Sequence, residues 1–248
     1  MRALILAAGR GSRMGQLGDE RPKCLVEFDG KPLIARQLAA LRGGGAQAVG
    51  VVRGYRAEMI DLPDLTYFHN ARWAETNMVM SLTTAAEWLK AGPVVVSYAD
   101  ILYRHELVRD LAAAAGDLVI TYDRAWRSLW SRRFINPLSD AETFRTDSSG
   151  RLIEIGNKAR SIDEISGQYM GLLKFAPHAW RDVEALLTTL DAQTRDRLDM
   201  TGLLQRLLWE KVAIRTIGTD GQWAEIDNPS DLALYERMAK DGELLLEG

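Results

Sequence analysis

The chain has 248 residues and a formal net charge of −3, with 31 Lys and Arg against 34 Asp and Glu, which excludes the strongly basic surface that nucleic-acid binding needs. Cys24 is the sole cysteine, so no intrachain disulfide can form. No apolar run approaches the ~18 residues of a membrane span and no signal pattern opens the chain, so we expect a cytoplasmic globular protein without membrane or nucleic-acid partners.

Strand and helix patterns alternate through the first half of the chain. Strand patterns cover 2–8, 47–53, 65–68, 93–99 and 117–122, and helical patterns cover 32–42, 78–90 and 104–115. This alternation predicts a Rossmann-like α/β fold, with a mostly parallel central sheet and helices on both faces. Ligands of such sheets bind beside the carboxyl ends of the strands.

The pattern changes after residue 122, where a small β-rich lid is predicted over about 122–175. Its strand patterns are 142–146, 151–155 and 168–175, with a turn at 147–150. The lid is followed by helices at 177–190 and 200–210 and by strands at 212–217 and 222–226. A last helix begins at Pro229, with Asn228 as its cap. No long Gly, Ser or Pro linker interrupts 1–248, which we therefore interpret as a single domain with a fraying tail at 244–248.

The loop after the first strand has the composition of a phosphate site. It reads Leu6, Ala7, Ala8, Gly9, Arg10, Gly11, Ser12, Arg13, Met14. Small residues let backbone N–H groups approach phosphate oxygens, and the nearby cations Arg13 and Lys23 would neutralise them. Met14 replaces the third glycine of the dinucleotide fingerprint, and no Gly-Lys-Ser/Thr triplet of a Walker loop occurs. The alternative is that these glycines only end a strand.

Carboxylates follow two strand patterns that lie far apart in the sequence. Asp100 ends the pattern at 93–99, and Asp227 ends the pattern at 222–226. Two carboxylates at strand ends can hold a hard cation such as Mg²⁺, although each Asp could instead cap the helix that follows it. Glu225 shares a face with Asp227 in an extended strand and would assist or replace it.

The strings LAAGRGSRM and RPKCLVEFDGKPLI closely resemble the signature of the nucleotidyltransferase superfamily, which charges small phosphates with NTPs. The resemblance implies that the loop residues wrap the nucleotide and that Arg13 and Lys23, the candidate catalytic cations, hold its phosphates. The implied nucleotide-binding residues of the loop are Leu6, Ala7, Ala8, Gly9, Gly11 and Ser12. The resemblance further implies that Asp100 and Asp227 bind the catalytic Mg²⁺. We expect Asn77 to contact the base or the acceptor, or alternatively to cap a helix.

Further strings resemble the phosphocholine cytidylyltransferase branch, which also contains 2-aminoethylphosphonate cytidylyltransferases. They are NMVMSL, SYADILY, DAETF, IGNKA and GQYMGLLKF. In the segment RLIEIGNKA, Lys158 matches the lysine that holds the acceptor phosphate in sugar nucleotidyltransferases. Asn157 and Ala159 depart from the flanking Glu and Pro of those enzymes, which argues against a sugar acceptor. A lone lysine near a turn is otherwise a solvated surface charge.

An acceptor of this branch is anionic at one end and cationic at the other. Tyr122 and Trp126 belong to a series of aromatic residues spaced by four that continues to Trp130. Aromatic faces attract quaternary ammonium groups, and the adjacent Asp123 would accept hydrogen bonds from a primary amine. The alternative is an apolar helix stripe packed in the core. Further candidate acceptor-binding residues are Asp140 and Glu142.

We therefore expect a CTP-dependent cytidylyltransferase that joins CMP to a small amino-bearing phosphate or phosphonate and releases pyrophosphate. Mg²⁺ is the expected cofactor, and the sequence is compatible with a homodimer. Two alternatives stay open: a sugar-1-phosphate nucleotidyltransferase that uses another NTP, and a non-catalytic nucleotide-binding module.

Overall fold

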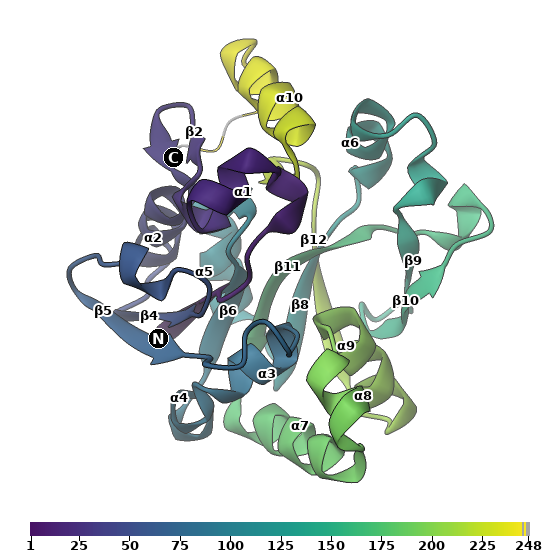
Figure 1. Ribbon diagram of the computed structural model, residues 1–248. Helices are drawn as coiled ribbons and strands as arrows, with labels where there is room; N and C mark the ends of the chain where they lie inside the picture. Colours follow the sequence, from purple (N-terminus) through teal and green to yellow (C-terminus); the bar gives the residue numbers. More distant parts are fainter. Residues whose placement is uncertain (245, 247–248) are drawn as a thin grey trace.

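A seven-stranded sheet in the order β12-β8-β11-β6-β1-β4-β5 forms the centre of the computed structural model, which describes residues 1–244 and 246 (Figure 1). Its strands are β1 (Arg2–Ala7), β4 (Ala48–Arg53), β5 (Leu65–His69), β6 (Val94–Tyr98), β8 (Leu118–Asp123), β11 (Gln168–Phe175) and β12 (Ile214–Thr219). β11 runs antiparallel to β6 and β8, and the other neighbouring pairs are parallel. The predicted mostly parallel α/β sheet is thus confirmed, but the strand pattern at 168–175, predicted as part of the lid, is β11 of this central sheet.

Both faces of the sheet are covered, as the nearly unbroken apolar run of β1 requires. Ala3 and Ile5 belong to one hydrophobic cluster, and Leu4 and Leu6 belong to the other. Helices α2 (Leu33–Gly43), α5 (His105–Ala113), α6 (Trp126–Arg133) and α10 (Pro229–Lys240) contribute to the first cluster. Helices α3 (Met78–Thr83), α4 (Ala86–Ala91), α7 (Pro177–Thr189) and α9 (Met200–Trp209) contribute to the second.

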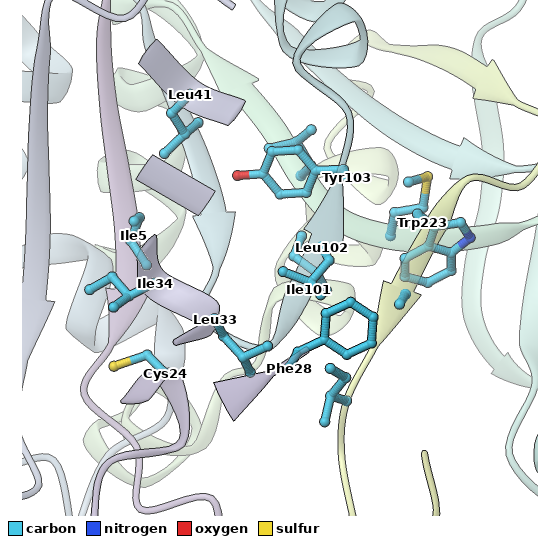
Figure 2. Packing of buried hydrophobic residues seen from close by; sticks show 14 of the residues in the cluster. Ile5, Cys24, Phe28, Leu33, Ile34, Leu41, Ile101, Leu102, Tyr103 and Trp223 are labelled. Carbon is cyan, nitrogen blue, oxygen red and sulfur yellow. The ribbon is translucent and has the colours of Figure 1, made fainter. Parts of the chain in front are cut away.

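Three two-stranded ribbons accompany the sheet: β2 (Glu27–Phe28) with β3 (Lys31–Pro32), β9 (Glu142–Thr146) with β10 (Leu152–Lys158), and β7 (Ile101–Tyr103) with β13 (Trp223–Glu225). In Figure 1, α6, β9 and β10 lie to the right of the sheet, away from α2 and β5. Figure 2 shows Tyr103 and Trp223 of the β7–β13 ribbon within the same hydrophobic cluster as Leu33 and Ile34 of α2. This packing fixes the ribbon against the sheet.

The remaining segments are short. They are α1 (Gln16–Glu20), α8 (Ala192–Arg197), and the 3₁₀ turns η1 (Ser12–Met14), η2 (Lys23–Leu25), η3 (Ala57–Met59), η4 (Pro137–Ser139) and η5 (Ile162–Glu164). Within the described residues, no helix is both long and apolar enough to cross a membrane. Most of the predicted fraying tail, 244–248, lies outside these residues.

The helix expected over 78–90 is interrupted between α3 and α4. Thr83 Oγ1 donates to the carbonyl of Met80, and Thr84 Oγ1 donates to the carbonyl of Ser81, each at 2.7 Å. Such side-chain bonds compete with the helical backbone pattern, which explains why periodicity alone missed the break. The predicted start of α10 is confirmed, because Asn228 Oδ1 accepts from the backbone N of Asp231 at 3.0 Å.

Candidate active site

The glycine loop leaves the carboxyl end of β1 and packs directly on Lys23. Gly11 has a φ of +68°, in the left-handed region that favours glycine. A Cβ on Gly11 would lie 2.8 Å from the Cβ of Lys23. The glycine therefore permits both the turn and the close approach of the loop to the lysine.

A cavity lies over this loop, and we call it the glycine-loop cavity. Every predicted nucleotide-binding residue lines it: Leu6, Ala7, Ala8, Gly9, Gly11, Ser12, Arg13, Lys23 and Asn77. Asp100 lines the same cavity, together with Trp73 and Ser81 from outside the loop. Asn77 also caps α3, because its Oδ1 accepts from the backbone N of Met78 at 2.8 Å. Capping and cavity lining are thus compatible at this position.

Opposite charges meet beside the glycine loop. Lys23 Nζ lies 2.7 Å from Asp100 Oδ2 and 2.7 Å from Asp227 Oδ1, and Arg13 Nη1 lies 3.0 Å from Asp227 Oδ2. Burial alone would lower the pKa of Lys23, but attraction by the two carboxylates raises it above its ordinary value. Burial would likewise raise the pKa of Asp227, but Lys23, together with Arg13 and Arg133, outweighs burial and lowers that pKa. Lys23 and Asp227 therefore both remain charged near neutral pH.

The β7–β13 ribbon explains how Asp100 and Asp227 come together. Asp100 follows β6 and immediately precedes β7, whereas Asp227 follows β13. Ile101 pairs with Glu225 across the ribbon, and the backbone N of Ile226 donates to the carbonyl of Asp100 at 2.9 Å. The two carboxylates are therefore positioned by backbone pairing between segments that are far apart in the sequence.

The donor set fits a hard cation. Asp100 Oδ1 is buried and has no hydrogen-bond partner among the described residues, so an oxygen ligand is available beside Asp227. Among the residues that the structure describes, no cluster of three or more His, Cys, Asp or Glu side chains could hold a metal ion, so a cation here would have two carboxylate ligands from the protein. Mg²⁺ commonly takes one or two carboxylates and completes its coordination with substrate phosphates and water. Asp100 and Asp227, beside a loop of the phosphate-binding type, match this coordination preference of Mg²⁺.

A second cavity adjoins the first and shares Arg13, Met78 and Tyr98 with it. We call it the acidic cavity, because five carboxylates line it: Asp140, Glu142, Asp199, Glu225 and Asp227. Arg13 is the one basic side chain among its described lining residues. Burial raises the pKa of Glu142, and the neighbouring Asp199 and Asp140 raise it further. Such a cavity would attract a cationic group.

Four residues predicted to bind the acceptor do not line either of these two cavities, and a role for them in acceptor binding stays a prediction. Asp123 is fully buried, and its carboxylate accepts from the backbone N of Ala125 and of Gly221 and from Trp223 Nε1. Of the other three, Trp126 is buried, Tyr122 stacks on Phe144, and Lys158 is exposed. The core interpretation of the aromatic stripe therefore holds for Trp126, whereas Trp130 reaches the acidic cavity.

Sequence reasoning missed Asp199 and Arg133. Asp199 caps α9 by accepting from the backbone N of Gly202 at 2.8 Å, and an Asp before a helix normally signals only a cap. Arg133 pairs with carboxylates about a hundred positions later, at Glu225 and Asp231. No local pattern predicts such a pairing, because the aromatic residues around Arg133 indicate only an amphipathic helix.

Solved structures of similar fold support the architecture. An inositol-1-phosphate CTP transferase from T. maritima superimposes with a TM-score of 0.75 over 98% of this chain and 96% of its own, at 20% identity. A CTP:phosphocholine cytidylyltransferase from Streptococcus pneumoniae gives a TM-score of 0.71 over 96% of this chain and 98% of its own, at 19% identity. At these identities the likeness concerns the fold.

Sequence comparison reaches further. A Campylobacter jejuni protein named CTP:phosphoglutamine cytidylyltransferase is 37% identical over 94% of this chain and 98% of its own length. A 2-aminoethylphosphonate cytidylyltransferase from Lancefieldella rimae is 28% identical over 94% of this chain and 91% of its own. The family model described as a MobA-like NTP transferase domain matches residues 3–195. The chain therefore belongs to the family of MobA-like NTP transferases and is a nucleotidyltransferase.

Proposed function

We propose that the enzyme transfers CMP from CTP to a small phosphate or phosphonate that carries an ammonium group, and releases pyrophosphate. One observation carries the proposal: the glycine-loop cavity and the acidic cavity meet at Arg13, with Lys23, Asp100 and Asp227 at the junction. A nucleotide and an acceptor bound in the two cavities would present their phosphorus groups to the same cluster of charges. The relatives named for phosphoglutamine and aminoethylphosphonate support this acceptor class.

The carboxylates favour an acceptor with a primary ammonium over one with a quaternary ammonium. Asp140, Glu142 and Asp199 can accept hydrogen bonds, which a primary ammonium donates and a choline group cannot. We therefore place phosphocholine behind aminoethylphosphonate and phosphoglutamine as acceptors.

The proposed reaction needs no protein nucleophile. An oxygen of the acceptor phosphate attacks the α-phosphorus of CTP in line, and the bond to the β-phosphate oxygen breaks to release pyrophosphate. Arg13 and Lys23 hold the triphosphate, so catalysis consists mainly of positioning and charge neutralisation. Asp100 and Asp227 are the residues that would hold Mg²⁺. When bound, this cation supplies further neutralisation between the two anionic substrates.

An acceptor and nucleotide panel with pyrophosphate release as the readout tests the proposal. The acceptors are phosphoglutamine, 2-aminoethylphosphonate, phosphocholine and glucose 1-phosphate, each with CTP, UTP, ATP or GTP. We expect turnover with CTP and a kcat/KM about tenfold or more higher for the primary-ammonium acceptors than for phosphocholine, since charged hydrogen bonds are lost in choline.

Two results would contradict the proposal. Faster turnover with glucose 1-phosphate and UTP would identify a sugar-1-phosphate nucleotidyltransferase. Binding of CTP without pyrophosphate release for any acceptor would leave nucleotide binding without the proposed transfer. Asp199→Asn is the matched variant for the acceptor side, because asparagine keeps the cap of α9 while removing the charge. It should reduce the preference for primary ammonium without changing the KM for CTP.

A further inference from the structure

Arg133, the last residue of α6, is buried among the carboxylates around the end of β13, with its side chain only 1% exposed. Its Nε and Nη2 atoms each lie 3.0 Å from one carboxylate oxygen of Asp231, and its Nη1 lies 3.0 Å from Glu225 Oε2. Nη2 also lies 3.7 Å from Asp227 Oδ2. Burial disfavours the Arg133 cation, but its hydrogen bonds to Asp231 outweigh burial and raise its pKa.

Asp231 extends this contact to the backbone of the candidate metal ligand. Its Oδ2 accepts from the backbone N of Asp227 at 3.1 Å and from Asn228 Nδ2 at 2.9 Å. The guanidinium of Arg133 thus restrains Asp227 twice, directly at the carboxylate and indirectly through Asp231. A planar fork that forms two parallel hydrogen bonds fixes orientation as well as charge.

The same guanidinium contacts the wall of the acidic cavity. Its carbon atom lies 5.0 Å from the centre of the Trp130 ring and 5.1 Å from that of Phe134. Trp130 Nε1 donates to Asp140 Oδ2 at 3.0 Å, and Trp130 and Asp140 both line the acidic cavity. Arg133 therefore contacts both sides of the site. On one side it contacts Trp130 in the wall of the acidic cavity, and on the other it contacts the segment that carries Asp227.

We propose that Arg133 is a positioning residue, which holds the acceptor wall formed by Trp130 and Asp140 in a fixed relation to Asp227. This inference rests on the proposed function. The two sides meet through side chains from α6 and from the start of α10, so the guanidinium sets their relative placement. A displacement of about 1 Å between reacting groups can cost about 100-fold in rate.

Arg133→Lys is the decisive variant, because lysine keeps the charge but cannot form the fork. The matched control is Arg132→Met, since the neighbouring arginine on the same helix is more exposed and pairs with Glu243. Steady-state kinetics with CTP and 2-aminoethylphosphonate or phosphoglutamine give the main readout. We expect Arg133→Lys to lower kcat about 100-fold and raise the acceptor KM, with the CTP KM unchanged. Arg132→Met should match wild type.

Asp231→Asn is the second variant, should Arg133→Lys fail to fold. Asparagine keeps the shape at position 231 and weakens the fork, so the same split between acceptor KM and CTP KM is expected. Wild-type kinetics in a folded Arg133→Lys would overturn the proposal. A fall in kcat that matches the loss of folded protein, with both KM values unchanged, would also overturn it, because that result reflects stability alone.

Amide hydrogen exchange separates this proposal from the proposed function. If wild type releases no pyrophosphate with any acceptor, the proposed function fails, but the mechanical connection can still be measured. Arg133→Lys should then speed exchange in 126–141 and in 225–231 together, whereas Arg132→Met should not. Unchanged exchange in either segment would overturn the positioning role.

Discussion

At the scale of single residues, the amine of Lys23 neutralises two carboxylates that a bound metal cation could otherwise neutralise. Its amine lies between Asp100 and Asp227, which the fold brings together from distant parts of the chain. Buried charges cost free energy unless partners compensate for lost hydration, so removing one partner is more damaging than replacing the whole group. The stability of the site should therefore depend on whichever cation satisfies the two carboxylates.

Lys23→Met should lower the free energy of unfolding by about 3 kcal/mol in EDTA, because it leaves two carboxylates without their shared partner. Mg²⁺ should then stabilise this variant more than wild type, since the cation binds only the folded arrangement. Thermal unfolding with EDTA and with MgCl₂ measures both effects, and pyrophosphate release should fall by orders of magnitude. Lys240→Met, at an exposed position, is the control. Equal Mg²⁺ responses in both variants would remove Asp100 and Asp227 as metal ligands.

Glu142 gives acceptor binding a pH dependence with a definite sign. Its pKa is raised above 4.5 by burial and by the neighbouring Asp199 and Asp140, and only its ionised form attracts an ammonium group. The acceptor KM of wild type should therefore rise as the pH falls below neutral, at higher pH than an ordinary glutamate would cause. Glu142→Gln should raise the acceptor KM about tenfold at neutral pH.

Dividing the acceptor KM of Glu142→Gln by that of wild type isolates the effect of Glu142, because the acceptor's own phosphate titrates identically in both assays. This ratio should fall towards one as the pH is lowered from neutral through the raised pKa of Glu142. A constant ratio across that range would show that Glu142 does not titrate against the acceptor.

At the scale of elements, the conformation of the turn between β1 and η1 requires a glycine at Gly11 but not at Gly9. Gly11 is left-handed and touches the side chain of Lys23, whereas a Cβ on Gly9 would meet nothing within 4 Å. A glycine-rich stretch therefore contains positions with different physical demands. The two glycines form a matched pair for experiment.

Gly11→Ala should destabilise the fold by about 1–2 kcal/mol, because alanine is strained in the left-handed region and would displace Lys23. Gly9→Ala should leave the free energy of unfolding unchanged. Denaturant unfolding measures this difference, and calorimetric binding of CTP tests whether Gly9 instead faces the nucleotide. Equal stability of the two variants would contradict the structural distinction between them.

At the scale of the whole molecule, the two cavities are joined by contacts between distant segments. Arg72 Nη2 lies 2.5 Å from Asp196 Oδ2, and the backbone N of Asn77 donates to the carbonyl of Asp196 at 2.7 Å. These bonds tie the segment before α3, at the glycine-loop cavity, to α8. Asp199 of the acidic cavity lies two residues after the end of α8. The walls of both cavities are thus parts of one connected structure.

Local sequence pattern predicted most of the strands of the sheet and the residues that line the glycine-loop cavity. Strand β1 and its glycine loop are contiguous, so one short string contains both the buried run and the turn chemistry. Asn228 and Pro229 announced α10 for the same local reason. The two-residue strands, the ribbon strand β7 and the break before α4 escaped prediction, because they depend on pairing or side-chain bonds that periodicity does not display.

By itself, the sequence determined the α/β class, the family resemblance and the loop with Arg13 and Lys23, since these follow from neighbouring residues. Only the tertiary structure decided which residues face the acidic cavity: it buried Asp123 and Trp126 and brought Asp199 forward. It also placed Arg133 beside Asp227. The physical reason is that burial and ion pairing depend on distances across the folded chain, and a one-dimensional pattern contains no such distances.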